Sequence, residues 1–273
     1  MGVDDMKKVT KVTRQRKPGR YNVYLDDEFA LAVDEKILIK YDLFKGTELE
    51  DDALKEIEAA EFEQKAYTKA LVYATGRMRS KMQVIIKLKE NEFPGLVIAH
   101  VIDRLEAANV IDDARFAEEY VRSAIHSGKL GPRGVRTKLQ QLGVDKYLIE
   151  DALAEYSEED QVDQLDDKVE RLMAKYARQS HFMAVQKTKQ KLAQLGYDSK
   201  LVNAAVKRFE VDNEADDDQE WDNLDRDATS AANRYRQYEG WEFKKRLKAA
   251  LFRKGYDLSL VDKWIKAFEQ NLD

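Results

Sequence analysis

The fold is decided by a stretch that recurs along the chain, Gly143-Val144-Asp145-Lys146-Tyr147-Leu148-Ile149, which continues through apolar residues at helical spacing. The stretch returns without a gap at Gly196-Tyr197-Asp198 and again at Gly255-Tyr256-Asp257. A glycine just after a helix adopts a left-handed backbone easily, and an aspartate two residues later accepts from the exposed N–H groups of the next helix. The pattern therefore predicts a helix, a turn and a second helix at each place.

A degenerate copy comes first, at Phe93-Pro94-Gly95, where proline replaces the aspartate at the helix start. The helix before each turn also aligns, with a leucine at the matching position: Leu88, Leu139, Leu192 and Leu251. A further helix is predicted before each of these pairs, at about 63–75, 112–127, 160–178 and 219–238. The chain is thus predicted to be mainly all-α, with tandem three-helix repeats in an elongated curved array.

The segment before the repeats has a different pattern. Residues 8–16 and 20–26 are rich in Val, Thr and Tyr and are joined by the turn signal Lys17-Pro18-Gly19, and Phe29, Leu31 and Val33 alternate as a third strand. A short helix is predicted from Asp34 to Tyr41, and a helix from about Glu50 to Phe62 leads into the array. The predicted domains are a β-containing N-terminal module at 1–62 and helical repeats at 63–108, 109–156, 157–210 and 211–273.

Composition limits the class of protein. The 273 residues are 36% charged with a net charge of −5, so simple coating of nucleic acid by a basic protein is not indicated. The charge is unevenly distributed, because residues 210–227 hold ten acidic side chains. Cysteine is absent, and neither a signal peptide nor an apolar run long enough to span a bilayer is visible. We therefore expect a soluble, cytoplasmic chain without disulfides.

The sequence contains no recognisable catalytic, metal-binding or phosphate-binding motif. His100, His126 and His181 lie in different repeats without the spacing of metal ligands, and the glycine-rich loop 128–134 lacks the spacing of a phosphate-binding loop. The acidic pair Asp112-Asp113 is explained by helix capping. The sequence therefore predicts no catalytic residues, no metal and no cofactor, and a protein that works by binding.

Cations recur in the second helix of each repeat, on faces away from the apolar stripe, and Lys87, Lys138 and Lys191 occupy the same repeat position. The candidate partner- or DNA-binding residues are Arg77, Arg79, Lys81, Lys87, Arg115, Arg122, Lys129, Arg133, Arg136, Lys138, Lys187, Lys191, Lys244 and Lys245. Stacked repeats would line the helix-two cations into a stripe suited to phosphate or to an acidic protein surface, and the alternative is a solubilising face. No firm platform for base stacking is visible.

Several of these stretches resemble the RecX family. The most specific is Leu105-Glu106-Ala107-Ala108-Asn109-Val110-Ile111-Asp112-Asp113-Ala114-Arg115-Phe116-Ala117, followed by Gly131-Pro132-Arg133-Gly134-Val135. Arg77-Met78-Arg79-Ser80 resembles the Arg-Ser block of that family, and Arg20-Tyr21-Asn22-Val23-Tyr24-Leu25-Asp26 resembles the extended N-terminus of its Gram-positive members. The resemblance covers essentially the whole chain and weakens across residues 210–227.

The resemblance implies a non-enzymatic regulator of the RecA recombinase. Such a protein would bind RecA and RecA–single-stranded DNA filaments as a monomer and limit filament growth, ATP hydrolysis, strand exchange and coprotease activity in recombination, DNA repair and the SOS response. It would contact single-stranded DNA through the filament and would not bind membranes. The alternative is a general nucleic-acid-binding helical-repeat protein without a dedicated RecA partner.

Overall fold

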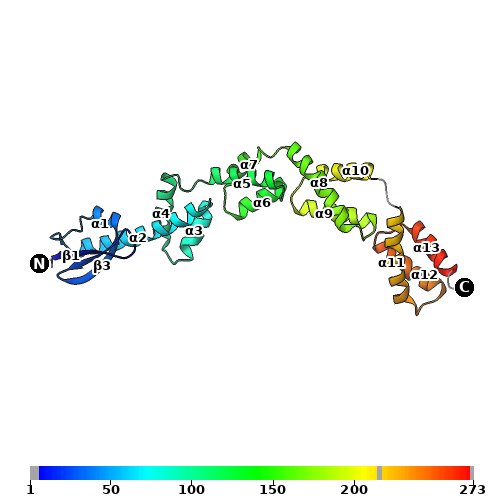
Figure 1. The fold of residues 1–273 in the computed structure, drawn as a ribbon, viewed down its shortest axis with the longest axis horizontal. Helices are drawn as coiled ribbons and strands as arrows, with labels where there is room; N and C mark the ends of the chain where they lie inside the picture. Colours follow the sequence, from blue (N-terminus) through cyan, green and yellow to red (C-terminus); the bar gives the residue numbers. More distant parts are fainter. Residues whose placement is uncertain (1–5, 214–216, 271–273) are drawn as a thin grey trace. The chain divides into compact units, whose positions relative to one another are not determined.

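The computed structural model describes residues 6–213 and 217–270 (Figure 1). Part of the acidic stretch, residues 214–216, lies outside the described residues, as do residues 1–5. The chain divides into two compact units, one formed by residues 1–116 and 141–148, the other by 117–140 and 149–273. The predicted domain boundaries differ from this division and stay a prediction.

The N-terminal module is a small antiparallel sheet with one short helix, as the sequence predicts. Its strands are β1 (Lys7–Arg14), β2 (Arg20–Leu25), β3 (Glu28–Asp34) and β4 (Glu48–Leu49), in the order β3-β2-β1-β4, and the helix is α1 (Glu35–Lys40). The two-residue strand β4 was not predicted, because it forms only by pairing with Lys7 and Lys8 of β1. Val9, Val23, Val33 and Leu43 form the centre of the core.

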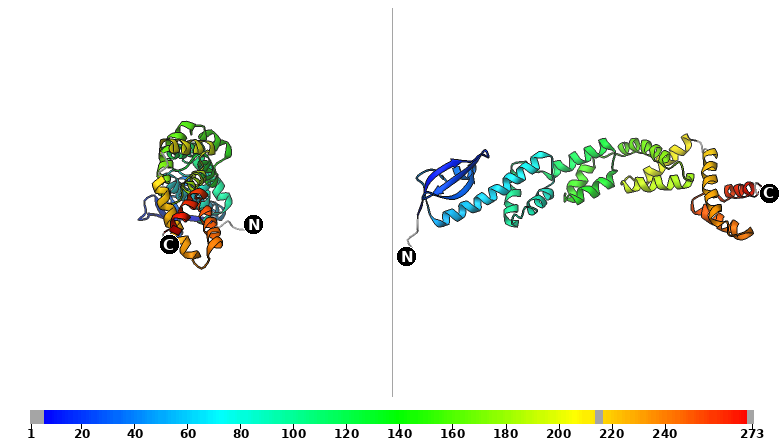
Figure 2. Two further views of the ribbon diagram at one scale, coloured as in Figure 1. Left: turned by 90° about the vertical axis from the view of Figure 1, so that its right-hand side faces the viewer. Right: turned by 60° about the horizontal axis from the view of Figure 1, so that its bottom comes forward.

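The helix that follows the module is continuous, which corrects the prediction of two helices separated near Phe62. Helix α2 runs from Asp51 to Gly76, and the sheet packs against its first half (Figure 2). Ile57 belongs to the core of the N-terminal module, whereas Ala66 and Ala70 belong to the core of the first repeat. The apolar pattern of α2 shifts between Ile57 and Ala66 because the helix packs first on the N-terminal module and then on repeat 1. No glycine or proline interrupts the helix there.

The remaining helices form the predicted sets of three, with α2 as the first helix of repeat 1. They are α3 (Lys81–Lys89), α4 (Gly95–Ala107), α5 (Asp113–Ser127), α6 (Pro132–Gln141), α7 (Lys146–Leu153), α8 (Glu158–Tyr176), α9 (His181–Gln194), α10 (Ser199–Asp212), α11 (Asp217–Tyr235), α12 (Gly240–Arg253) and α13 (Leu258–Gln270). The four aligned leucines of the second helices are all fully buried, which confirms the apolar stripe: Leu88, Leu139, Leu192 and Leu251.

The recurring turns have the predicted local geometry. Gly143, Gly196 and Gly255 have φ of 78°, 86° and 85°, the left-handed region that glycine adopts without strain. The aspartate two residues later caps the next helix in each copy, as Asp198 does by accepting from Lys200 N at 2.8 Å. In the degenerate copy, Glu92 holds the left-handed conformation at φ 60°, and Pro94 precedes α4.

These turns also join neighbouring repeats, which the sequence did not suggest. In each turn, the main-chain carbonyl of the residue before the glycine accepts a hydrogen bond from the previous repeat. The donor is the residue just before the second helix of that repeat. Ser80 Oγ donates to Leu142 O at 2.7 Å, and Ser180 Oγ donates to Lys254 O at 2.6 Å. In the middle pair, Gly131 N donates to Leu195 O at 2.9 Å. Each turn is therefore both a helix cap and a connection between repeats.

The residue between glycine and aspartate anchors the turn. The Tyr197 hydroxyl lies 2.6 Å from Gly128 O and 2.9 Å from Gln164 Oε1, and Tyr256 OH lies 2.9 Å from Asp227 Oδ2. Burial is the main cause that raises the pKa of both phenols, and Tyr156 adds to the effect at Tyr197. The folded chain therefore holds both tyrosines in the protonated form.

This arrangement predicts a loss of stability in alkali. The unfolded chain releases the phenolic protons near pH 10 and the folded chain keeps them, so the free energy of unfolding falls as pH rises above about 10. In the Tyr197→Phe variant this fall should be shallower, by up to about 1.4 kcal/mol per pH unit. Urea unfolding between about pH 8 and about pH 11 measures this slope. The control is Tyr147→Phe, at an exposed position. Identical slopes in the Tyr197→Phe variant and the wild type would contradict the prediction.

Candidate functional site

The cations proposed from the sequence lie in and around the second helices. The structure places Lys81 and Lys87 on α3, Arg133, Arg136 and Lys138 on α6, Lys187 and Lys191 on α9, and Lys244 and Lys245 on α12; Arg77 and Arg79 precede α3, Arg115 and Arg122 lie on α5, and Lys129 lies in the loop before α6. Lys87, Lys138 and Lys191 each directly precede a fully buried leucine. The three lysine side chains therefore lie on equivalent sides of their helices. That the cations of successive repeats line up into one stripe stays a prediction.

Several of these cations are paired with carboxylates within the protein. Arg136 makes two parallel bonds to Glu150, from Nε to Oε1 and from Nη2 to Oε2, each 2.7 Å long. This fork-like pairing fixes the side chain between α6 and α7 and raises the pKa of Arg136. Four more pairs are Lys81–Glu106 at 2.8 Å, Lys87–Glu90 at 3.0 Å, Arg133–Asp198 at 3.2 Å and Lys244–Glu269 at 2.7 Å. Part of the predicted stripe is therefore already neutralised by neighbouring acids.

Arg122 is the most heavily compensated of the set. Its guanidinium contacts Glu118 at 3.4 Å, Glu119 at 3.1 Å and Glu155 at 3.1 Å. The hydrogen bonds to Glu155 are the main cause that raises its pKa. Arg122 connects α5 to the end of the same repeat, so its position favours a structural role over a contact with DNA.

Other predicted cations lie over aromatic rings or project into solvent. The Arg79 guanidinium is 4.3 Å from the centre of the Tyr73 ring, and the Lys245 ammonium is 4.6 Å from the centre of the Trp241 ring. Lys187 lies 5.9 Å from Tyr176. Eight members of the set are exposed: Arg77, Arg115, Arg122, Lys129, Arg133, Lys138, Lys191 and Lys245. Their side chains are therefore accessible to an external anion.

The acidic and histidine positions behave as ordinary helix residues. Asp112 caps α5 by accepting from Ala114 N at 2.9 Å, and Asp113 accepts from Lys81 N at 2.7 Å. Burial, the largest cause, raises the pKa of Asp113. His100 contacts Glu63 and His181 contacts Glu210. Among residues 6–213 and 217–270, no group of three His, Cys, Asp or Glu side chains is arranged to hold a metal ion.

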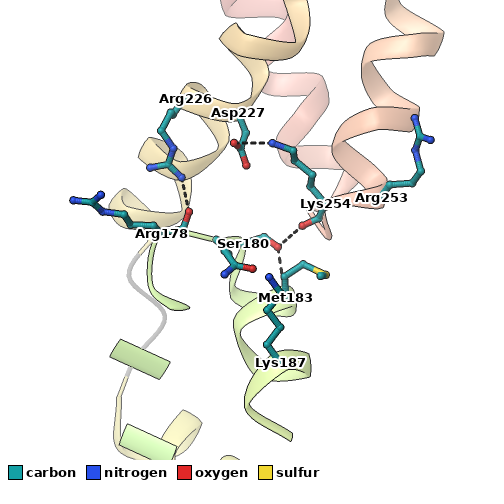
Figure 3. Close-up of a pocket in the computed structure, with 9 residues that line it drawn as sticks. Arg178, Ser180, Met183, Lys187, Arg226, Asp227, Arg253 and Lys254 are labelled. Atoms are coloured by element: carbon teal, nitrogen blue, oxygen red, sulfur yellow. Dashed lines mark hydrogen bonds and ion pairs between the residues drawn. The ribbon is translucent and has the colours of Figure 1, made fainter. Parts of the chain in front are cut away.

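A cationic pocket at the boundary of repeats 3 and 4 was missed by the sequence reasoning. It has a volume of about 630 Å³, and its charged lining is Arg178, Lys187, Arg226, Arg253, Lys254 and Asp227 (Figure 3). Of these side chains only Lys187 was singled out. Arg253 and Lys254 directly precede the connecting turn at Gly255, and nothing in the local sequence shows that this turn lies beside Arg178 and Lys187.

The fold and the distribution of charge define a class: tandem three-helix-repeat proteins with a β-containing module in front. Family models match four parts of the chain: the regulatory protein RecX N-terminal domain at 7–50, and the first, second and third RecX three-helix domains at 66–105, 112–153 and 217–265. The chain belongs to the RecX family of regulatory proteins, so a regulatory role follows. The repeat predicted at 157–210 lies between two of the matched ranges.

Relatives and solved structures agree with this assignment. The regulatory protein RecX of Limosilactobacillus reuteri is 34% identical over 96% of this chain and 98% of its own length, and that of Bacillus subtilis is 33% identical over the same shares. A crystal structure of regulatory protein RecX matches with a TM-score of 0.66 at 33% identity, covering 74% of this chain and 99% of that one. A second match is RecX from Lactobacillus salivarius, with a TM-score of 0.51 at 27% identity, covering 56% of this chain and 99% of that one. None of the helices in the described residues is both long and apolar enough to span a bilayer.

Proposed function

We propose that this chain binds the RecA recombinase and its filaments on single-stranded DNA, and thereby inhibits filament growth, ATP hydrolysis, strand exchange and coprotease activity. Membership of a family of regulatory proteins supports the proposal. The observation that carries it is the recurrence of Lys87, Lys138 and Lys191 at equivalent positions beside a buried leucine. Repeated cations suit a partner that is itself repetitive and anionic, as a nucleoprotein filament is. The proposed protein has no active site of its own, needs no cofactor and acts as a cytoplasmic monomer.

A charge reversal at these repeat positions tests the proposal. The triple variant Lys87→Glu, Lys138→Glu and Lys191→Glu should raise the concentration needed for half-maximal inhibition of RecA ATPase on single-stranded DNA by at least about tenfold, because each new carboxylate repels an anionic partner. The assay is steady-state ATP hydrolysis at substoichiometric amounts of this protein. Circular dichroism verifies that the helices are retained.

The matched control reverses three cations on the third helices, with the same change in net charge: Lys146→Glu, Lys200→Glu and Lys263→Glu. These exposed residues lie on α7, α10 and α13. The proposal predicts near wild-type inhibition for the control. Equal inhibition by both triple variants would overturn the placement of the interface, and no inhibition by the wild type would overturn the function itself.

The cationic pocket keeps a second candidate function open, that of a general nucleic-acid-binding protein. The two candidates differ in their preferred ligand. Tighter binding to RecA-coated single-stranded DNA than to naked DNA at physiological salt supports the RecA regulator. Equal affinity for both, with a steep dependence on salt, supports the general binder.

A further inference from the structure

The helix α12 carries a row of side chains that no family match assigns. Trp241, Lys245, Ala249 and Arg253 follow one another at intervals of four residues, so they lie along one side of the helix. Twelve residues of helix span about 18 Å. All four line a pocket of about 340 Å³, and Arg253 also lines the larger cationic pocket at the boundary of repeats 3 and 4. The two pockets share Arg253, and together they are here called the α12 surface.

The aromatic end of the α12 surface is exposed to an unusual degree. Glu239 directly precedes α12, and Trp241 is the second residue after it. The exposed fraction of Trp241 is 73%. The corresponding residues in repeats 1 and 3 are Met82 and Phe182, which lie against Gly143 and Gly255 of the following repeats. In the described residues no repeat covers Trp241. The Lys245 Nζ atom lies over the indole, 4.6 Å from the ring centre, and the tryptophan stays largely exposed.

The cationic end of the α12 surface has a large excess of positive charge. Five basic side chains and one acid line the larger pocket, and Lys254 Nζ pairs with that acid, Asp227, at 2.8 Å. Arg226 donates to the main-chain carbonyl of Arg178, which leaves its charge uncompensated by a carboxylate there. Figure 3 shows Arg178 and Arg253 on opposite sides of the pocket, with both guanidinium groups directed outward from its centre. Arg178, Lys187, Arg226 and Arg253 therefore give the lining four positive charges that Asp227 does not neutralise.

We propose that the α12 surface is a binding site for single-stranded nucleic acid, with a base stacked on Trp241 and phosphates on Lys245, Arg253 and the pocket cations. An accessible aromatic face beside a cationic groove is the combination that binds single strands without sequence preference. A duplex suits it less, because paired bases cannot stack on the indole. An acidic protein surface would use the cations and leave the indole without a stacking partner.

The α12 surface includes none of Lys87, Lys138 and Lys191, which carry the RecA proposal, and binding there does not need RecA. The inference rests on the second candidate function, nucleic-acid binding, and gives it a site. It is tested on the full chain with naked, fluorescently labelled oligothymidine, so its failure would leave the RecA assay unaffected. The wild-type dissociation constant should be on the order of micromolar at low salt. Trp241→Ala should weaken binding by about tenfold, whereas Phe252→Ala, another exposed aromatic of α12 outside both pockets, should not.

The phosphate contacts are tested by the salt dependence of the same titration. In the double variant Arg178→Gln and Arg253→Gln, the slope of log K against log salt should fall by about 0.7 for each phosphate that the variant no longer neutralises. The control, Lys263→Gln and Lys266→Gln on α13, removes the same charge outside the pockets and should keep the slope. Inorganic polyphosphate, which has no bases, should bind the wild type and Trp241→Ala equally.

Three results would overturn the proposal. The first is wild-type affinity in the Trp241→Ala variant, and the second is an unchanged salt slope in the arginine variant. The third is tighter binding of duplex than of oligothymidine. A concentration-dependent increase in mass that Trp241→Ala abolishes, with DNA affinity unchanged, would instead assign the indole to contacts between copies of the chain.

Discussion

The Gly196→Ala substitution is expected to destabilise the connection between repeats 2 and 3 by about 3 kcal/mol, through two effects that act together. A Cβ at this position would overlap Gly134 N and lie 2.6 Å from Gly134 Cα. Both are main-chain atoms, so no side chain can rotate away. The φ of 86° at Gly196 adds the strain of a left-handed conformation.

The loss should be local, because each repeat mainly contacts its neighbours and the chain need not unfold as one cooperative unit. Gly131 N and Arg133 N donate across this connection, to Leu195 O and Gly196 O. Amide hydrogen exchange at these two residues is therefore the direct measurement, and both should exchange much faster in the Gly196→Ala variant. The control is Gly19→Ala, which has a positive φ of 70° but open space around it, and should cost about 1 kcal/mol. Retained protection of both amides in Gly196→Ala would contradict the close approach.

The second large effect is expected at Glu61, which connects the N-terminal sheet to α2. Its side chain is 6% exposed, pairs with Arg20 and accepts from Asp34 N at 2.7 Å. Glu61→Ala would leave the largely buried guanidinium of Arg20 and the main-chain N–H of Asp34 without the carboxylate. The variant should lose about 3–5 kcal/mol of stability in the N-terminal module.

Urea unfolding followed by near-ultraviolet circular dichroism of the module's tyrosines measures this loss. The control is Asp52→Ala, which removes a carboxylate from the same helix at an exposed pair with Lys55 and should cost far less stability than Glu61→Ala. In the double variant Arg20→Met and Glu61→Met, stability should recover much of the loss, because apolar residues can replace a buried ion pair. Equal stabilities of the Glu61→Ala and Asp52→Ala variants would show that the pair does not hold the module on α2.

Local signals in the sequence were sufficient for much of the fold. Glycine at position 196 and aspartate at 198 specify a turn and a cap by their own conformations, and Leu192 and its equivalents mark the buried side of each second helix. The strands β1 to β3 were predicted in the same way, from alternation and from the turn at Pro18. The break placed near Phe62 was wrong because a change of packing partner resembles the end of a helix when only the periodicity is visible.

The predicted site was only partly recoverable, because the availability of a cation depends on the acids that the fold brings to it. Nothing local to Arg136 indicates that Glu150 lies at 2.7 Å, and nothing local to Arg178 indicates that it shares a pocket with Arg253. Trp241 was not singled out from the sequence, since periodicity does not reveal whether another repeat covers a given helix face.

The connection between repeats has a consequence for how a chain of this kind could gain or lose a unit. The acceptor is a main-chain carbonyl in each case, at Leu142, Leu195 and Lys254, and substitution of those side chains does not remove it. The donor side needs only a serine hydroxyl or the backbone of a glycine. A unit that is gained or lost by duplication or deletion can therefore keep this hydrogen bond without a matched mutation at the acceptor residue, as long as glycine stays where two backbones meet, as at Gly134 and Gly196.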